Sequence, residues 1–172
     1  KQKYGRWYYK DHYVEMGDLL PLPEELEPKP PIDGQELKIK ASLTAEMQNG
    51  KIRFLVSSNI PDGTPLIFTL HGKDYSAQCS SITNNSILTS DWFSNLNNPL
   101  KNGFYTLKIS CAIYEVLPDK IKKIFGERNR NITGNFVIFK PIEGNMINFS
   151  YALTLKDNSV NIIDMQQRLS DL

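Results

Sequence analysis

Cysteine is scarce in this chain of 172 residues, which contains only Cys79 and Cys111. Two cysteines are too few for the dense disulfide framework of a small secreted scaffold, and these two are too far apart for a Cys-x-x-Cys site. Histidine is equally rare, and His12 and His71 do not have the spacing of metal ligands. No run of alternating Asp residues suggests a calcium loop. We therefore expect no metal and no other cofactor.

The chain also lacks a charge excess and a long apolar run. Twenty basic side chains against nineteen acidic ones give a formal net charge of +1, whereas a dedicated nucleic-acid binder normally carries a strong basic excess. No apolar run reaches the roughly 18 residues that a membrane-spanning helix needs. The sequence thus predicts no nucleic-acid partner and no transmembrane segment.

Residues 1–35 differ in composition from the rest of the chain. The first part is aromatic and polar without a clear period, and residues 21–34 contain five prolines, which favours an extended and semi-rigid connector. We predict an N-terminal segment and linker over 1–35. Trp7, Tyr8 and Tyr9 could contact a partner or stack on sugar rings, or they could simply pack against the following domain.

From Glu36 onward apolar and polar residues alternate, which is the period of a half-buried strand. Asn49-Gly50 after the first such run is the strongest two-residue hairpin signal. Further strand-like runs lie at 52–58, 66–72, 75–82, 86–93, 104–114, 135–142 and 146–155. Short strands separated by turn signals favour an all-β domain over 36–157, arranged as a β-sandwich with Greek-key connections. A closed barrel is the alternative.

Two segments have a helical period instead. Pro118 suits a first helical turn and Gly126 can end a helix. The apolar side chains between them share one face, at Leu117, Ile121, Ile124 and Phe125. This predicts a short helix inserted between strands. A C-terminal amphipathic helix is predicted over 158–172. Its apolar face would consist of Ile162, Met165, Leu169 and Leu172.

Leu100, Gly103 and Tyr105 have the spacing of a tyrosine corner. In this motif a Tyr near the start of a strand donates its hydroxyl to the backbone a few residues upstream, across an arched Greek-key connection. The glycine lets the chain turn sharply, and the leucine fills the core beneath the arch. The alternative is an ordinary strand start that carries a Tyr. Either way, the motif concerns the fold and not the chemistry.

The chain resembles the immunoglobulin-like modules of bacterial envelope and secreted proteins in four stretches: SNIPDGTPLIFTL, FSNLNNPLKNGFYTLKIS, LPDKIKKIFG and NITGNFV. The resemblance covers about residues 36–140. It implies an immunoglobulin-like sandwich, a location outside the cell or in the cell envelope, and a non-catalytic role as a spacer or binding unit.

Five further residues are candidates for a site. Cys79 and Cys111 fall in register with core-facing positions, so they could form a buried disulfide or remain two free, buried thiols. Lys120, Lys122 and Lys123 lie in the predicted inserted helix. They could hold an acidic polymer of the cell wall, or they could be the solvated face of that helix.

These observations favour a non-catalytic interaction or spacer module, with a protein or a cell-wall polymer as its partner. A carbohydrate-binding module is the first alternative, and it requires Trp7 or Trp92 to form an exposed flat patch with neighbouring tyrosines. A hydrolase is the second alternative. It requires acidic or histidine side chains from distant loops to meet in one pocket.

Overall fold

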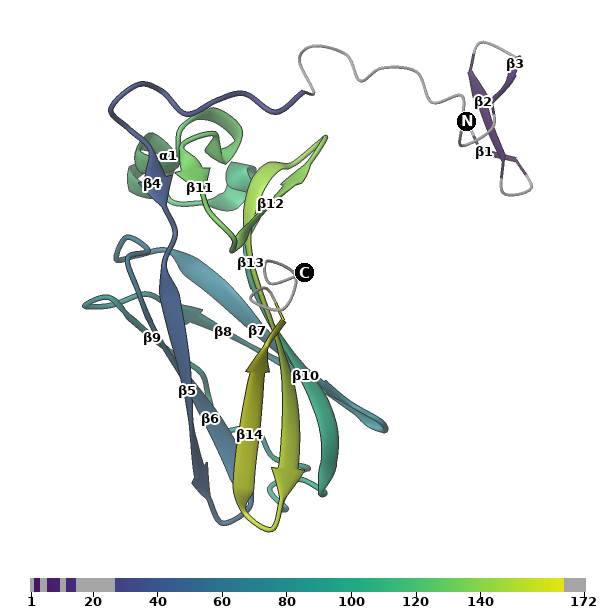
Figure 1. The fold of residues 1–172 in the computed structure, drawn as a ribbon, viewed down its shortest axis with the longest axis vertical. Helices are drawn as coiled ribbons and strands as arrows, with labels where there is room; N and C mark the ends of the chain where they lie inside the picture. Colours follow the sequence, from purple (N-terminus) through teal and green to yellow (C-terminus); the bar gives the residue numbers. More distant parts are fainter. Residues whose placement is uncertain (1, 4–5, 10–11, 15–26, 166–172) are drawn as a thin grey trace.

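The computed structural model describes residues 2–3, 6–9, 12–14 and 27–165, and most of this part is β-structure (Figure 1). The larger main sheet contains β7 (Pro65–Gly72), β8 (Tyr75–Ile82), β10 (Gly103–Cys111), β12 (Val137–Lys140), β13 (Gly144–Lys156) and β14 (Ser159–Asp164). Its order is β12-β13-β10-β7-β8, and β14 also pairs with β13. The smaller main sheet has the order β5-β6-β9, with β5 (Ala41–Gln48), β6 (Lys51–Ser58) and β9 (Ile87–Thr89). All these pairs are antiparallel.

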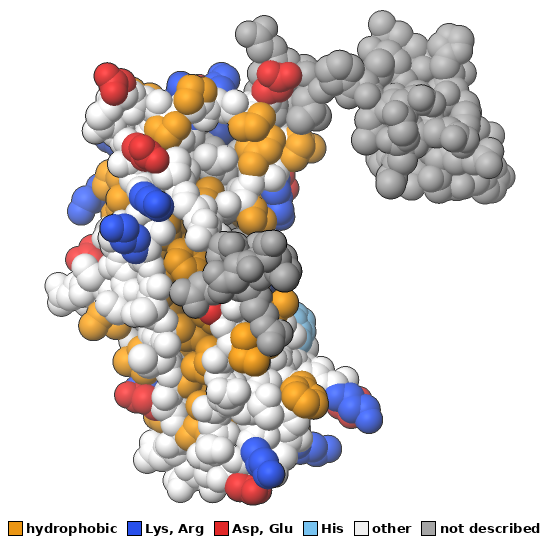
Figure 2. Space-filling view, in the orientation of Figure 1, with side chains coloured by type: hydrophobic (Ala, Val, Ile, Leu, Met, Phe, Trp, Pro, Cys, Tyr) orange, Lys and Arg blue, Asp and Glu red, His pale blue; other side chains and the backbone are white. Residues whose placement is uncertain are grey.

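The two main sheets bury their facing side chains in one core. Alternate residues of a strand point to the same face, and the buried ones come from both sheets, including Phe54, Val56, Phe68, Leu107 and Phe149. On one side the edge strands β5 and β14 come together. Figure 2 shows hydrophobic side chains gathered along this seam. The all-β class predicted from the alternating pattern is therefore confirmed, with the sheets packed as in a β-sandwich.

Two-residue turns connect the hairpins at the lower end in Figure 1. Asn49 and Gly50, with φ of 52° and 73°, join β5 to β6 as the sequence predicted. Asp157 and Asn158, with φ of 50° and 62°, join β13 to β14 in the same way. Positive φ at both turn residues matches the right-handed twist of the paired strands.

The C-terminal helix predicted over 158–172 is wrong for the described residues 159–164. They form β14, and all six residues of this strand pair with residues 151–156 of β13. Val160 and Ile162 pack against the core at period two, because burial against an existing sheet outweighs the weaker helical pattern. Residues 166–172 lie outside the described part of the chain.

Between β10 and β12 the chain forms a cap over the upper end of the sandwich in Figure 1, which we define as residues 114–133. It contains η3 (Tyr114–Val116), α1 (Asp119–Phe125), η4 (Glu127–Asn129) and β11 (Ile132–Thr133). Helix α1 lies where the sequence predicted an inserted helix. Its buried residues Ile121 and Phe125 belong to the same core as the sheets.

A strap formed by residues 29–39 lies against the cap. Within it β4 (Leu37–Lys38) pairs in parallel with β11, and the Arg130 guanidinium donates to the carbonyl oxygen of Pro30 at 2.7 Å. Part of the proline-rich segment is thus held to the domain before residue 36.

A separate three-stranded antiparallel sheet is formed near the N-terminus by β1 (Gln2–Lys3), β2 (Arg6–Tyr9) and β3 (His12–Val14). Among the described residues, no helix is long and apolar enough to cross a membrane.

Candidate functional site

A pocket of about 290 Å³ opens where the β7–β8 turn meets the loop that precedes β10. We call it the end pocket. Three separate segments line it, namely residues 73–75, Asn95 and residues 100–105. The volume lies at the lower end of the range for small-molecule sites, so the end pocket suits one ring or one side chain.

Two tyrosine rings at the end pocket are fixed in position. Tyr75 and Tyr105 pack edge to face, with ring centroids 6.0 Å apart. The Tyr75 hydroxyl donates to the carbonyl oxygen of Ser94 at 3.1 Å, and that of Tyr105 donates to the carbonyl oxygen of Lys101 at 2.8 Å. Burial raises the pKa of both hydroxyls above the ordinary value of 10.0.

The structure brings Leu100, Gly103 and Tyr105 together at this pocket. Leu100 is buried, and its backbone N–H donates to the carbonyl oxygen of Gly50 at 2.9 Å. Gly103 has a φ of 147°, a conformation that residues with a Cβ rarely adopt. The chain therefore arches between Leu100 and Tyr105 and is closed by the bond from Tyr105 to Lys101.

Polar side chains surround the opening of the end pocket. Lys73, Asp74 and Lys101 are exposed, and none of the three makes an ion pair with another described residue. Asn102 is tied to the β13–β14 turn, because its side chain donates to the Asp157 carboxylate and accepts from the Asp157 N–H, both at 3.1 Å. The pocket thus combines a fixed wall with free donors and acceptors.

The outer edge of β8 is a second candidate. This strand pairs with β7 alone among the described residues. Its eight residues, YSAQCSSI, contain no charge, no Pro and no Gly. The other edge strands either are short, as β9 is, or carry a charge, namely Glu46 in β5, Lys140 in β12 and Asp164 in β14. Since charges and irregularities normally protect an edge from pairing, β8 is the least protected edge.

The sequence left Cys79 and Cys111 open as a disulfide or as two free thiols, and in the structure both thiols are free. Cys79 on β8 lies opposite Phe68 of β7, and Cys111 on β10 lies opposite Leu66 of β7. The two strands are thus separated by β7, a distance of roughly 10 Å across the sheet. A disulfide needs Cα atoms within about 7 Å. The alternative, two thiols directed toward the core, describes the observed state.

The lysines predicted as a contact site have different surroundings. Lys122 is half-buried, and its ammonium donates to the Glu115 carbonyl oxygen at 2.8 Å and lies 5.5 Å from the centre of the Tyr114 ring. Lys120 and Lys123 are exposed. Lys122 is therefore engaged within the cap.

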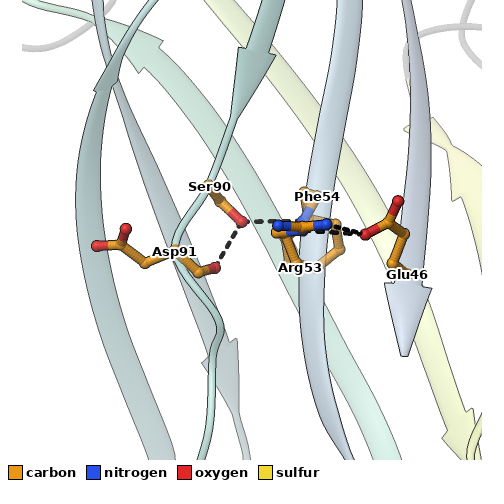
Figure 3. A network of polar contacts seen from close by, with 5 residues as sticks. All are labelled: Glu46, Arg53, Phe54, Ser90 and Asp91. Atoms are coloured by element: carbon orange, nitrogen blue, oxygen red, sulfur yellow. Dashed lines mark hydrogen bonds and ion pairs between the residues drawn. The ribbon is translucent and has the colours of Figure 1, made fainter. Parts of the chain in front are cut away.

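The aromatic candidates fall into two groups. The backbones of Trp7, Tyr8 and Tyr9 form β2, but their side chains lie outside the described part. Trp92 is half-buried, and the Arg53 guanidinium lies 4.7 Å from its ring centre. Arg53 is in turn paired with Glu46 (Figure 3). One face of Trp92 is thus covered by a cation and is not a free flat patch.

Ser90 fixes the chain next to Trp92. Its hydroxyl accepts from the Phe54 N–H at 2.9 Å and donates to the Asp91 carbonyl oxygen at 2.8 Å (Figure 3). Ser90 is only 4% exposed, so both bonds are shielded from water. Ser90 therefore ties the segment before Trp92 to Phe54 of β6, next to the Arg53–Glu46 pair.

The sequence predicted only part of the end pocket, and it did not predict the open edge of β8. It found the Tyr105 end of the pocket but not Lys73, Asp74, Tyr75 or Asn95, which meet Tyr105 only after β7 and β10 pair. The uncharged run at 75–82 was visible in the sequence and could have indicated an open edge. In residues 27–165, no group of three His, Cys, Asp or Glu side chains is arranged to hold a metal ion.

Comparisons of the chain with protein-family models, with curated proteins and with solved structures found no match.

Proposed function

We propose that this chain is a non-catalytic interaction module with an immunoglobulin-like Greek-key fold, belonging to a bacterial envelope or secreted protein. The order of the strands supports the fold. β6 pairs with β9 in one sheet, whereas β7 pairs with β10 and β10 with β13 in the other. Successive strands thus change sheets three times, from β6 to β7, from β8 to β9 and from β9 to β10, as in immunoglobulin-like sandwiches.

The bond between Tyr105 and Lys101 supports the same fold. It joins a hydroxyl near the start of β10 to a carbonyl four residues upstream, which is the arrangement expected of a tyrosine corner. Leu100 lies buried within the arch. The resemblance of the sequence to envelope and secreted modules supports the location.

One observation carries the interaction role, namely the open edge of β8. An unpaired edge offers N–H and C=O groups to a strand from another chain, and this mode of recognition needs no pocket. Ser76, Gln78 and Ser80 are exposed and alternate with side chains directed toward the core. The partner that fits this edge is an extended segment of another protein, whose backbone pairs with β8.

Photo-crosslinking in the producing cells tests this proposal. A photoreactive residue is placed at Ser80 of the full chain, and a matched one at Asn161, an exposed position on the edge strand β14. We expect a discrete adduct with one protein from position 80 only, and we expect Gln78→Lys to remove it because a charge opposes strand addition. An adduct from position 161 alone, or one that survives Gln78→Lys, would contradict the proposal.

Fractionation of the same cells tests the location. The native protein is expected in the envelope or the medium. A wholly cytosolic protein would refute the envelope and secretion part of the proposal, while leaving the strand-addition experiment valid.

A further inference from the structure

The end pocket and the β8 edge present different groups to a ligand. The edge presents backbone groups in a row, whereas the end pocket is a cavity of about 290 Å³ with an apolar interior. The apolar side chains among its lining residues are those of Tyr75, Leu100, Phe104 and Tyr105. Because both tyrosine hydroxyls are bound to backbone carbonyls, the rings do not need to be ordered when a ligand enters, which lowers the cost of binding.

The rim of the end pocket offers donors and acceptors of several kinds. Lys73 and Lys101 supply ammonium donors, Asp74 supplies a carboxylate acceptor, and Asn95 supplies an amide that can do both. All four side chains are exposed. Phe104 also borders the pocket and is 83% exposed. Its ring adds an exposed apolar surface beside the cavity.

These features narrow the chemistry of the ligand. An acidic polymer would pair with the two lysines, but it would meet Asp74 at the same rim and would leave the apolar interior unused. An apolar side chain of a partner would fill the interior but would gain no hydrogen bonds from the exposed rim. A neutral sugar ring matches both parts, because its C–H face is apolar while its hydroxyls each donate and accept.

We propose that the end pocket binds one neutral pyranose ring of a glycan. The ring packs its C–H face against the apolar interior, and its hydroxyls bond to Asp74, Asn95 and Lys101. The small volume of the pocket limits the contact to one ring. The affinity for a single sugar is therefore expected to be weak.

Nuclear magnetic resonance of the full, ¹⁵N-labelled chain tests this site. The probes are the methyl glycosides of glucose, galactose, mannose and N-acetylglucosamine at millimolar concentration. With at least one of them, we expect saturable shifts of the amide signals of Lys73, Asn95 and Lys101. Shifts at none of these amides with any of the four glycosides would overturn the proposal.

Substitutions at the rim avoid disturbing the core. Asp74→Ala and Asn95→Ala should each weaken the binding of that glycoside by about fivefold, which corresponds to one lost hydrogen bond. Asn161→Ala is the matched control, an exposed asparagine on β14, and should leave the affinity unchanged. Equal effects of Asn95→Ala and Asn161→Ala would overturn the assignment of the site.

Two competing ligands are tested in the same way. Stronger shifts with N-acetylphenylalaninamide than with any glycoside would identify a pocket for a protein side chain and overturn the proposal. Binding of inorganic phosphate alone, abolished by Lys101→Ala, would also overturn it. Neither result affects the crosslinking at β8, so the two proposals fail separately.

Discussion

Asn131 joins the strap to the cap, because its side-chain oxygen accepts a hydrogen bond from the backbone N–H of Ile32 at 2.9 Å. The two residues are 99 positions apart in the sequence. The side-chain nitrogen of Asn131 donates to the carbonyl oxygen of Ile124 at 3.1 Å, and Asn131 is fully buried. One amide therefore connects the strap, α1 and the start of β11.

Removal of this amide should destabilise the domain. Asn131→Ala leaves the Ile124 carbonyl and the Ile32 N–H without their partner, and we expect a loss of about 3 kcal/mol in the free energy of unfolding. Urea unfolding followed by circular dichroism measures it. Asn135→Ala is the control, since Asn135 is exposed, and should change stability by less than about 0.5 kcal/mol. A loss below about 1 kcal/mol for Asn131→Ala would contradict the role of the amide.

The hydroxyl of Tyr105 should contribute measurably to stability. Tyr105→Phe keeps the ring but removes the bond to Lys101, and we expect a loss of about 1 kcal/mol. Tyr114→Phe is the matched control, because the Tyr114 hydroxyl makes no hydrogen bond to the described residues. Both variants are compared by thermal and urea unfolding. Equal stabilities for the two would argue against a tyrosine corner.

Cys111 should make stability fall at alkaline pH. Burial raises the pKa of its thiol to about 12 from the ordinary value of 9.0. Below pH 9 both the folded and the unfolded chain keep the proton. Between pH 9 and 12 only the unfolded chain loses it, so the free energy of unfolding falls by about 1.4 kcal/mol per pH unit.

Unfolding in urea at about pH 8 and about pH 10.5 measures this effect. Cys111→Ala should reduce the fall between the two pH values by about 2 kcal/mol, although it also removes some packing at both. Ser110→Ala, a neighbour without a titrating group, should leave the fall unchanged. If Cys111→Ala and the original chain lose the same stability, the thiol does not ionise on unfolding as argued.

Local signals in the sequence predicted much of the fold. Asn49-Gly50 predicted the β5–β6 hairpin, and the alternating runs predicted β6, β7 and β8 to within two residues. Such signals depend only on neighbouring residues. The same turn chemistry was present at Asp157-Asn158, where both residues have positive φ. The apolar spacing beyond it nevertheless predicts a helix, whereas the chain forms β14 there.

The features that needed distant partners could not be predicted. Nothing in the sequence near Asn131 indicates a hydrogen-bond partner. Its partner Ile32 lies 99 residues away, in the segment predicted to be a linker. The end pocket depends on β7 and β10 lying side by side, so that Tyr75 meets Tyr105. Pairing of this kind follows from the packing of the whole chain, which periodicity within one strand does not contain.

Arg53 should shield Trp92 from solvent. Its guanidinium lies over the indole ring and is held there by Glu46. In a Trp7→Phe background, Arg53→Ala should shift the tryptophan fluorescence to longer wavelength and increase its quenching by acrylamide. Arg130→Ala, which removes a guanidinium from the cap instead, should change neither. Unchanged quenching in Arg53→Ala would mean that the cation does not cover the ring in solution.

Gly72 should be required by the ring of Tyr105. A Cβ added at Gly72 would lie 2.6 Å from Cε1 and 2.8 Å from Cδ1 of that ring, so Gly72→Ala forces the ring to move. We expect a loss of about 2 kcal/mol, which is typical of overpacking in a filled core. The cause can be isolated with Tyr105→Ala, which removes the ring that the added methyl group meets.

A double-mutant cycle then separates this contact from any intrinsic preference for glycine at position 72. In a Tyr105→Ala background, Gly72→Ala should cost less than about 0.5 kcal/mol, because the methyl group enters the space left by the ring. The coupling energy is therefore expected to be about 1.5 kcal/mol, measured by urea unfolding of the four chains. Equal costs in the two backgrounds would show that position 72 needs glycine for its backbone alone, and that the wall of the end pocket does not depend on this contact.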